Sequence, residues 1–256
     1  MALILKMSET SPFSRQLILD FPSRPEFNFS NFVVSEGSRF AYECALQIAS
    51  EAPLTYSTLY LYGDRNLGKT HLLMAIGNRV SETHPEKKVI FLRGREFVHK
   101  IGEENSGEIT QTLHRLLETD YFLLDDADLL SGEPLAQEKL YLVYNTLRET
   151  GKKAIFAGLH RPEKLAATEP YLKSRFLWGM TAEIKPIDDR TTAKIIIKLG
   201  NDIGLNIPEK TINYLLTHIP RDFSSIKNSV EKINRESFLR KRKVSIPLAK
   251  EALNLP

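Results

Sequence analysis

The chain has 256 residues, which fits one domain or one domain with a small appendage. Its net charge of +3 is mildly basic and by itself gives no strong signal for nucleic-acid binding. A single cysteine, Cys44, excludes a disulfide framework and indicates a reducing compartment. No run approaches the roughly 20 apolar residues of a membrane span, and residues 1–5 are too short for a signal peptide. We therefore expect a cytoplasmic protein without a membrane partner.

The order of predicted elements indicates a flexible tail and two domains. Residues 1–26 contain several prolines and serines and predict a tail. Apolar strands then alternate with helices, which predicts an α/β domain over 27–186 with a parallel sheet covered on both faces. Four helices predict a small all-helical domain over 187–256. The strands are expected at 58–62, 88–92, 121–124, 153–157 and 181–184, and the helices at 38–52, 69–81, 95–101, 108–118, 135–150, 190–200, 208–217, 223–240 and 246–253, with a turn at 103–107.

A glycine-framed loop at residues 63–70 is the strongest motif of the chain. It follows the strand at 58–62, ends in Gly-Lys-Thr and opens into an apolar helix, the context in which G-x-x-x-x-G-K-[ST] binds phosphate. Backbone N–H groups and the helix dipole would attract the phosphates, Lys69 would reach the terminal ones, and Thr70 would hold Mg²⁺. The alternative is a glycine turn with an incidental lysine. The predicted nucleotide contacts are Gly63, Asn66, Leu67, Gly68, Lys69, Thr70 and His71.

Two carboxylates end the apolar strand at 121–124, where open α/β sheets bind ligands. Asp125 is predicted on the metal side, and Asp126 is predicted to orient or activate a water. Without a phosphate loop upstream, an Asp-Asp turn would be the better interpretation.

Two arginines complete the predicted site. Arg175 lies in Ser-Arg-Phe-Leu-Trp-Gly before the last strand, and Arg221 opens a helix of the small domain. As surface ion pairs they would contribute little to stability. The functional interpretation is a pair of phosphate-sensing cations, one of them an arginine finger.

In this order the motifs resemble those of AAA+ ATPases, and more specifically those of the DnaA replication-initiator family. Residues 27–34 resemble that family's adenine-side segment, which implies nucleotide contacts from Phe32, Val33 and Val34. Residues 62–73 and 172–179 resemble its phosphate loop and its finger motif. Arg161-Pro162 lies where the family's sensor 1 loop has Arg-Pro, but His160 replaces the usual Asp. The resemblance implies an AAA+ P-loop domain followed by a helical lid.

Residues beyond these motifs resemble a shorter relative, the regulatory inactivator of DnaA (Hda). Residues 242–251 are similar to its C-terminus, and the family's helix-turn-helix domain is not expected here. The tail contains Gln-Leu-Ile-Leu-Asp-Phe, which resembles the motif that binds the sliding clamp of DNA polymerase. The alternative is an ordinary apolar tail folded onto the domain. The predicted clamp contacts are Gln16, Leu17, Leu19 and Phe21.

The Hda resemblance implies a mechanism in which bound ADP or ATP, with Mg²⁺, locks the lid to the core. Arg175 would act in trans on the ATP of the partner DnaA. His160 argues against self-hydrolysis and Asp126 permits it, so weak or no intrinsic ATPase is expected. One alternative is a minimal initiator or helicase loader acting on DNA, which the basic residues 240–243 favour; another is a fragment of a full initiator. The sequence leaves open whether the chain forms a homodimer and whether it contacts DNA directly.

Overall fold

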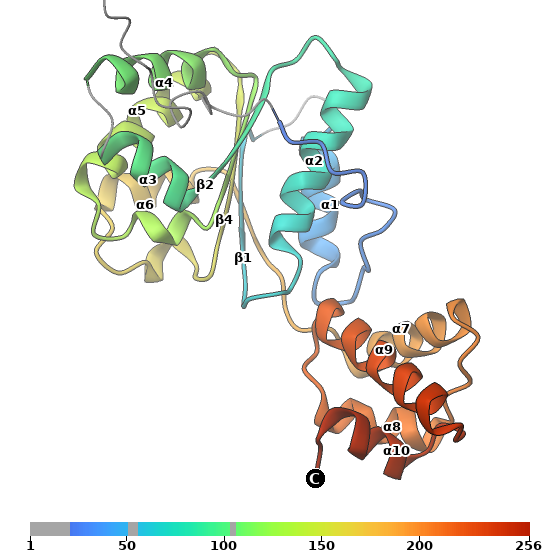
Figure 1. The fold of residues 1–256 in the computed structure, drawn as a ribbon. Helices are drawn as coiled ribbons and strands as arrows, with labels where there is room; N and C mark the ends of the chain where they lie inside the picture. The colour runs from blue at the N-terminus through green and yellow to red at the C-terminus, as the bar shows by residue number, and fades with distance from the viewer. Residues whose placement is uncertain (1–20, 51–55, 103–105) are drawn as a thin grey trace, which may run out of the picture.

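Five parallel strands form the centre of the first domain, in the order β2-β3-β4-β1-β5 (Figure 1). We analysed a computed structural model, which describes residues 21–50, 56–102 and 106–256. The predicted α/β fold with a parallel sheet is confirmed. The strands are β1 (Thr58–Tyr62), β2 (Val89–Arg93), β3 (Tyr121–Asp125), β4 (Lys153–Gly158) and β5 (Met180–Glu183).

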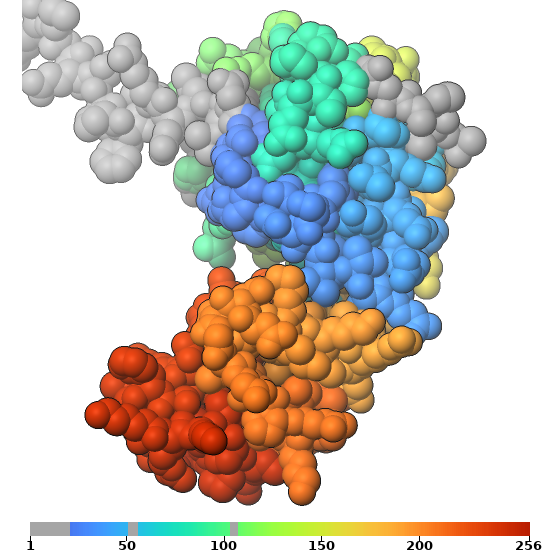
Figure 2. All heavy atoms as spheres, turned by 90° about the vertical axis from the view of Figure 1, so that its right-hand side faces the viewer, coloured from blue at the N-terminus to red at the C-terminus, as the bar shows by residue number. Residues whose placement is uncertain are grey.

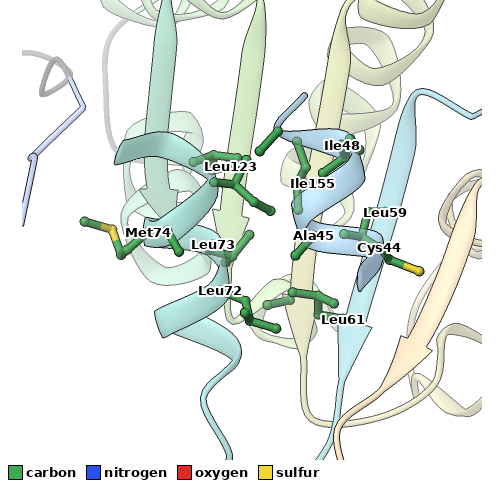
Figure 3. Packing of buried hydrophobic residues seen from close by; sticks show 14 of the residues in the cluster. Cys44, Ala45, Ile48, Leu59, Leu61, Leu72, Leu73, Met74, Leu123 and Ile155 are labelled. Atoms are coloured by element: carbon green, nitrogen blue, oxygen red, sulfur yellow. The ribbon is translucent and has the colours of Figure 1, made fainter. Parts of the chain in front are cut away.

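Helices cover both faces of the sheet because successive strand residues point to opposite sides. Leu59 and Leu61 pack against α1 and α2 (Figure 3). Tyr60, between them in the strand, belongs to the core on the other face. Cys44 is one of the buried residues of the first face. The first face carries α1 (Arg39–Ile48) and α2 (Lys69–Thr83); the second carries α3 (Gly94–Gly102), α4 (Ser106–Glu118), α5 (Pro134–Glu149) and α6 (Pro170–Leu177).

A separate helical domain follows β5 and has its own buried core (Figure 1). Apolar residues of its four helices form that core. In the described part of the chain no strand follows Pro186, as predicted. The helices are α7 (Asp189–Asp202), α8 (Glu209–His218), α9 (Phe223–Arg240) and α10 (Ile246–Leu253).

One helix of the structure was not predicted. The sequence analysis placed no element between 158 and 181, but α6 fills part of this stretch and begins with Pro170 in its first turn. Proline is favoured at that position because the N–H it lacks would have no helical partner. Residues 172–179 were interpreted only as a finger motif before the last strand, so no helix was predicted there. The helices at 223–240 and 246–253 were predicted with the observed bounds.

Within the described ranges, no helix is long and apolar enough to cross a membrane. The predicted turn at 103–107 falls largely on residues outside the described part, and so does the tail up to residue 20.

Candidate nucleotide site and arginine cluster

The glycine loop connects β1 to α2 and closes around its lysine. The Nζ of Lys69 donates hydrogen bonds to the backbone oxygens of Gly63 and Asp64, each at 2.7 Å. Burial lowers the pKa of Lys69, and the carboxylate of Asp125 opposes this shift. Gly68 is the N-cap of α2 with a φ of 97°, and a Cβ there would lie 2.7 Å from the ring of Phe32. The loop therefore requires glycine at this position.

The acid of β3 faces the hydroxyl that follows the lysine. Thr70 Oγ1 donates to Asp125 Oδ2 at 2.5 Å, and the backbone N–H of Asp126 donates to Asp125 Oδ1 at 3.0 Å. Burial raises the pKa of Asp125, and the Thr70 hydrogen bond opposes the rise. A hydroxyl and a carboxylate are the hard oxygen donors that Mg²⁺ takes in nucleotide sites.

Among the described residues, no group of three or more His, Cys, Asp or Glu side chains could hold a metal ion alone. As a pair of oxygen ligands, Thr70 and Asp125 would fit a metal that takes its other ligands from phosphate oxygens and water. Asp126 follows with a left-handed φ of 51° and is half-buried. Its role as a water-orienting acid stays a prediction.

An aromatic segment lies beside the first turn of α2. The Nε2 of His71 is 2.9 Å from the backbone oxygen of Asn28. The rings of Phe27 and Phe32 meet the His71 ring edge-on, with centroids 5.2 and 5.3 Å away, and Phe32 stacks on Tyr42. Burial lowers the pKa of His71. The segment expected near adenine thus adjoins the phosphate loop.

The sequence analysis did not single out Asn28 or Tyr42. The spaced phenylalanines between 27 and 32 were a visible signal, but a local pattern does not reveal which side chains they contact. Leu67 of the loop packs against the first core, and Val34 is half-buried.

The same segment connects the α/β domain to the helical domain. Val33 packs against the core of the helical domain, and the backbone N–H of Lys185 donates to the oxygen of Gly37 at 3.1 Å. Figure 2 shows this side, with the helical domain directly below the blue segment. Residues 33–37 therefore lie where a bound nucleotide could link the two domains.

Arg221 lies in the helical domain and is half-exposed. Its Nη1 forms an ion pair with Asp189 Oδ1 at 2.5 Å, and its Nη2 donates to the backbone oxygen of Leu216 at 3.2 Å. Its own backbone oxygen accepts from the N–H of Ile187, next to the start of α7. The side chain of Arg221 thus contacts other lid residues, and its contact with a nucleotide stays a prediction.

Arg175 lies on α6 and faces α5. Its Nε donates to Asn145 Oδ1 and its Nη2 to the Tyr141 hydroxyl, both at 3.0 Å. Its guanidinium carbon lies 4.1 Å from the ring centroid of Trp178. No carboxylate in the described ranges forms an ion pair with it, so it differs from the surface salt bridge that was the alternative. The sequence did not reveal these partners because they come from an element 30 residues away.

The sensor-loop and basic residues are exposed. His160 and Arg161 follow β4, and Arg161 pairs with Glu163 at 3.3 Å. In the basic run, Arg240 pairs with Glu236 at 2.8 Å, and Arg242 lies 3.6 Å from Glu251. These pairs fit a solvated helix end.

Phe21 is the one predicted clamp residue that the structure describes; Gln16, Leu17 and Leu19 lie outside the described residues. Phe21 is half-buried and packs against the first core. Its ring lies so close to Gly77 of α2 that a Cβ at this glycine would overlap it. In this structure the aromatic end of the motif is therefore docked on the α/β domain.

Comparison with known proteins assigns both domains. Residues 24–183 match the model of the bacterial DnaA ATPase domain, and residues 189–253 match the model of the Hda lid domain. The chromosomal replication initiator DnaA of Symbiobacterium thermophilum is 31% identical over 230 residues, which are 90% of this chain and 50% of that protein. The chain thus spans about half the length of this curated relative.

Solved structures agree with this assignment. Domain III of Thermotoga maritima DnaA has a TM-score of 0.79 at 28% identity, over 91% of this chain and 98% of that one. AMPPCP-bound DnaA of Aquifex aeolicus has a TM-score of 0.77 at 30% identity, over 85% of this chain and 68% of that one. A DnaA bound to AMPPCP and single-stranded DNA also has a TM-score of 0.77 at 30% identity, over 86% and 69%. The chain belongs to the bacterial DnaA ATPase domain family of AAA+ proteins, and its helical domain matches the model of the Hda lid domain.

Proposed function

We propose that this chain is a nucleotide-binding regulator of replication initiation. It binds the sliding clamp through Gln16, Leu17, Leu19 and Phe21, and it stimulates hydrolysis of DnaA-bound ATP through Arg175. ADP or ATP with Mg²⁺ occupies its own phosphate loop and links the α/β domain to the lid. Residues 189–253 match the Hda lid model. This match supports a regulator, because Hda is the regulatory inactivator of DnaA that the sequence resembles.

The environment of Arg175 is the observation that carries the proposal. Arg175 is held by neutral oxygens and aromatic rings, and no ion pair within the described ranges neutralises its charge. An arginine in this state can accept a new anion without breaking a salt bridge. Arginine fingers increase phosphoryl-transfer rates by about 10³–10⁵ in other systems.

The decisive experiment measures ATP hydrolysis by DnaA with this chain and DNA-loaded clamp present. We expect Arg175→Ala to reduce the stimulation at least about a hundredfold, while thermal unfolding and ADP binding stay unchanged. Arg95→Ala is the matched control, because Arg95 is an exposed arginine of the same domain. Full stimulation by Arg175→Ala would exclude the finger.

Nucleotide binding is tested separately on the isolated protein. Lys69→Ala should weaken binding of a fluorescent ADP analogue about ten- to a hundredfold, because a charge-assisted contact contributes about 1.5–3 kcal/mol. Mass spectrometry of the purified chain should find ADP or ATP. A protein without nucleotide and without affinity for the analogue would contradict the interpretation of the loop.

A minimal initiator or helicase loader remains the second candidate. The DnaA structure with single-stranded DNA, at 30% identity, favours it. A clamp pull-down separates the two candidates. Binding that disappears in Gln16→Ala/Leu19→Ala supports the regulator. Salt-sensitive binding of single-stranded DNA without clamp binding supports the loader.

A further inference from the structure

Trp178 contacts two arginines at the proposed finger. The guanidinium carbon of Arg175 is 4.1 Å from the indole centroid, and that of Arg148 is 3.9 Å from it. We infer that Trp178 is a positioning residue for Arg175, and that Arg148 holds the indole in place. The inference rests on the proposed function of Arg175 and adds two residues to it.

Both arginines contact the same aromatic side chain. Their guanidinium carbons lie over the Trp178 ring, so the indole joins the two cations in one stack. Arg148 comes from α5, whereas Arg175 and Trp178 come from α6 and the residue after it. The stack thus connects the two helices around the finger.

Exposure makes this arrangement functionally informative. Trp178 is 53% exposed, although a large aromatic side chain would gain from burial. Within the described ranges, neither Arg148 nor Arg175 has a carboxylate at ion-pair distance. The indole attracts each cation through its ring electrons and does not neutralise it. A carboxylate at this position would hold Arg175 equally firmly but would compete with the phosphate of a partner.

Three directions of constraint meet at the Arg175 side chain. Asn145 accepts from Nε, the Tyr141 hydroxyl accepts from Nη2, and the guanidinium carbon lies over the Trp178 ring. A free arginine side chain has many rotamers, and their loss opposes binding of a phosphate. Restricting them in advance lowers this entropic cost when the transition state forms. Removing the stack should therefore lower the maximal stimulated rate more than the affinity for the partner.

The kinetic test varies the concentration of this chain over a fixed amount of ATP-bound DnaA on DNA-loaded clamp. We expect Trp178→Leu to lower the maximal hydrolysis rate about 3- to 30-fold, the range that a cation–π contact supports. Arg148→Met should lower it about 2- to 5-fold, and Arg148→Lys should recover only part of this because it restores charge without a planar group. The half-saturating concentration should change less than twofold.

Leu142→Ala is the matched control, because Leu142 is a similarly exposed side chain of α5 at 46%. It should leave the maximal rate unchanged. If Trp178→Leu unfolds the chain, Trp178→Phe and Arg148→Met carry the test. Unchanged maximal rates in the folded variants, with Arg175→Ala inactive, would overturn the inference and leave the proposed function standing.

A spectroscopic readout reports the stack independently of activity. Trp178 is the only tryptophan of the chain, so incorporated 5-fluorotryptophan gives one ¹⁹F signal. Arg175→Ala and Arg148→Met should each shift this signal in the free protein, whereas Leu142→Ala should not. Unshifted signals in both arginine variants would overturn the inference that the two arginines stack on Trp178. Full stimulation by Arg175→Ala would instead overturn the proposed function.

Discussion

At the scale of single residues, His71 makes the aromatic segment sensitive to pH. Burial lowers the pKa of His71, whereas in the unfolded chain histidine binds a proton near pH 6.5. Below this pH the unfolded state binds more protons than the folded state, so acid reduces the free energy of unfolding. We expect the wild-type protein to lose more stability between about pH 7.5 and 5.5 than His71→Phe, which does not titrate.

Urea unfolding at several pH values measures this difference. His160→Phe is the control, because His160 is exposed, and it should keep the pH dependence of the wild type. Parallel stability curves for His71→Phe and wild type would show that His71 is not responsible.

The glycine loop could be predicted because a local motif specifies it, whereas its nucleotide contacts stay a prediction. The motif requires a glycine that can adopt a positive φ, then a lysine, then a residue with a hydroxyl group. This order can be read directly in the sequence. The contact between Thr70 and Asp125 joins residues 55 positions apart, and it followed from the rule that ligand sites lie at the carboxyl ends of parallel strands. No comparable rule connects Arg175 to Arg148. Their shared contact with Trp178 depends on how α5 and α6 pack, so it could not be predicted from the sequence.

At the scale of elements, α2 contacts Phe21 of the tail and also begins at the glycine loop of the candidate nucleotide site. Gly77 of α2 leaves the space that the ring of Phe21 occupies. If Phe21 also fills the clamp pocket, it must leave α2 first. We expect Gly77→Ala to exclude the ring from α2 and to strengthen clamp binding up to about tenfold, because burying part of a phenylalanine contributes about 1.5 kcal/mol.

Surface plasmon resonance on immobilised clamp measures this change. Gly102→Ala is the control, because it is another helical glycine and nothing lies within 4 Å of its added Cβ. Phe21→Ala should weaken clamp binding, since it removes the aromatic anchor. Equal affinities of Gly77→Ala and wild type, with weaker binding by Phe21→Ala, would show that docking on α2 does not compete with the clamp.

At the scale of the whole molecule, the two domains could be predicted but their connection could not. Alternating strands and helices specified the α/β domain, and the end of the strand pattern at Pro186 specified the start of the helical one. The packing of Val33 against the lid core joins residues from opposite ends of the chain. Such contacts depend on how two folded domains pack against each other, and no local sequence pattern encodes this packing.

Arg221 forms an ion pair with Asp189, and this pair would compete with a nucleotide for the Arg221 side chain. Arg221 must exchange Asp189 for a phosphate if it senses the nucleotide. Removing the competing carboxylate should then help: we expect Asp189→Asn to bind ADP about two- to fivefold more tightly, since a half-exposed pair contributes about 0.2–1 kcal/mol. Arg221→Gln should weaken ADP binding about ten- to a hundredfold. Titration with a fluorescent ADP analogue measures both. Asp202→Asn, which breaks the exposed pair with Lys198 at the other end of α7, should change nothing. Unchanged binding by Arg221→Gln would show that the lid holds the nucleotide without this arginine.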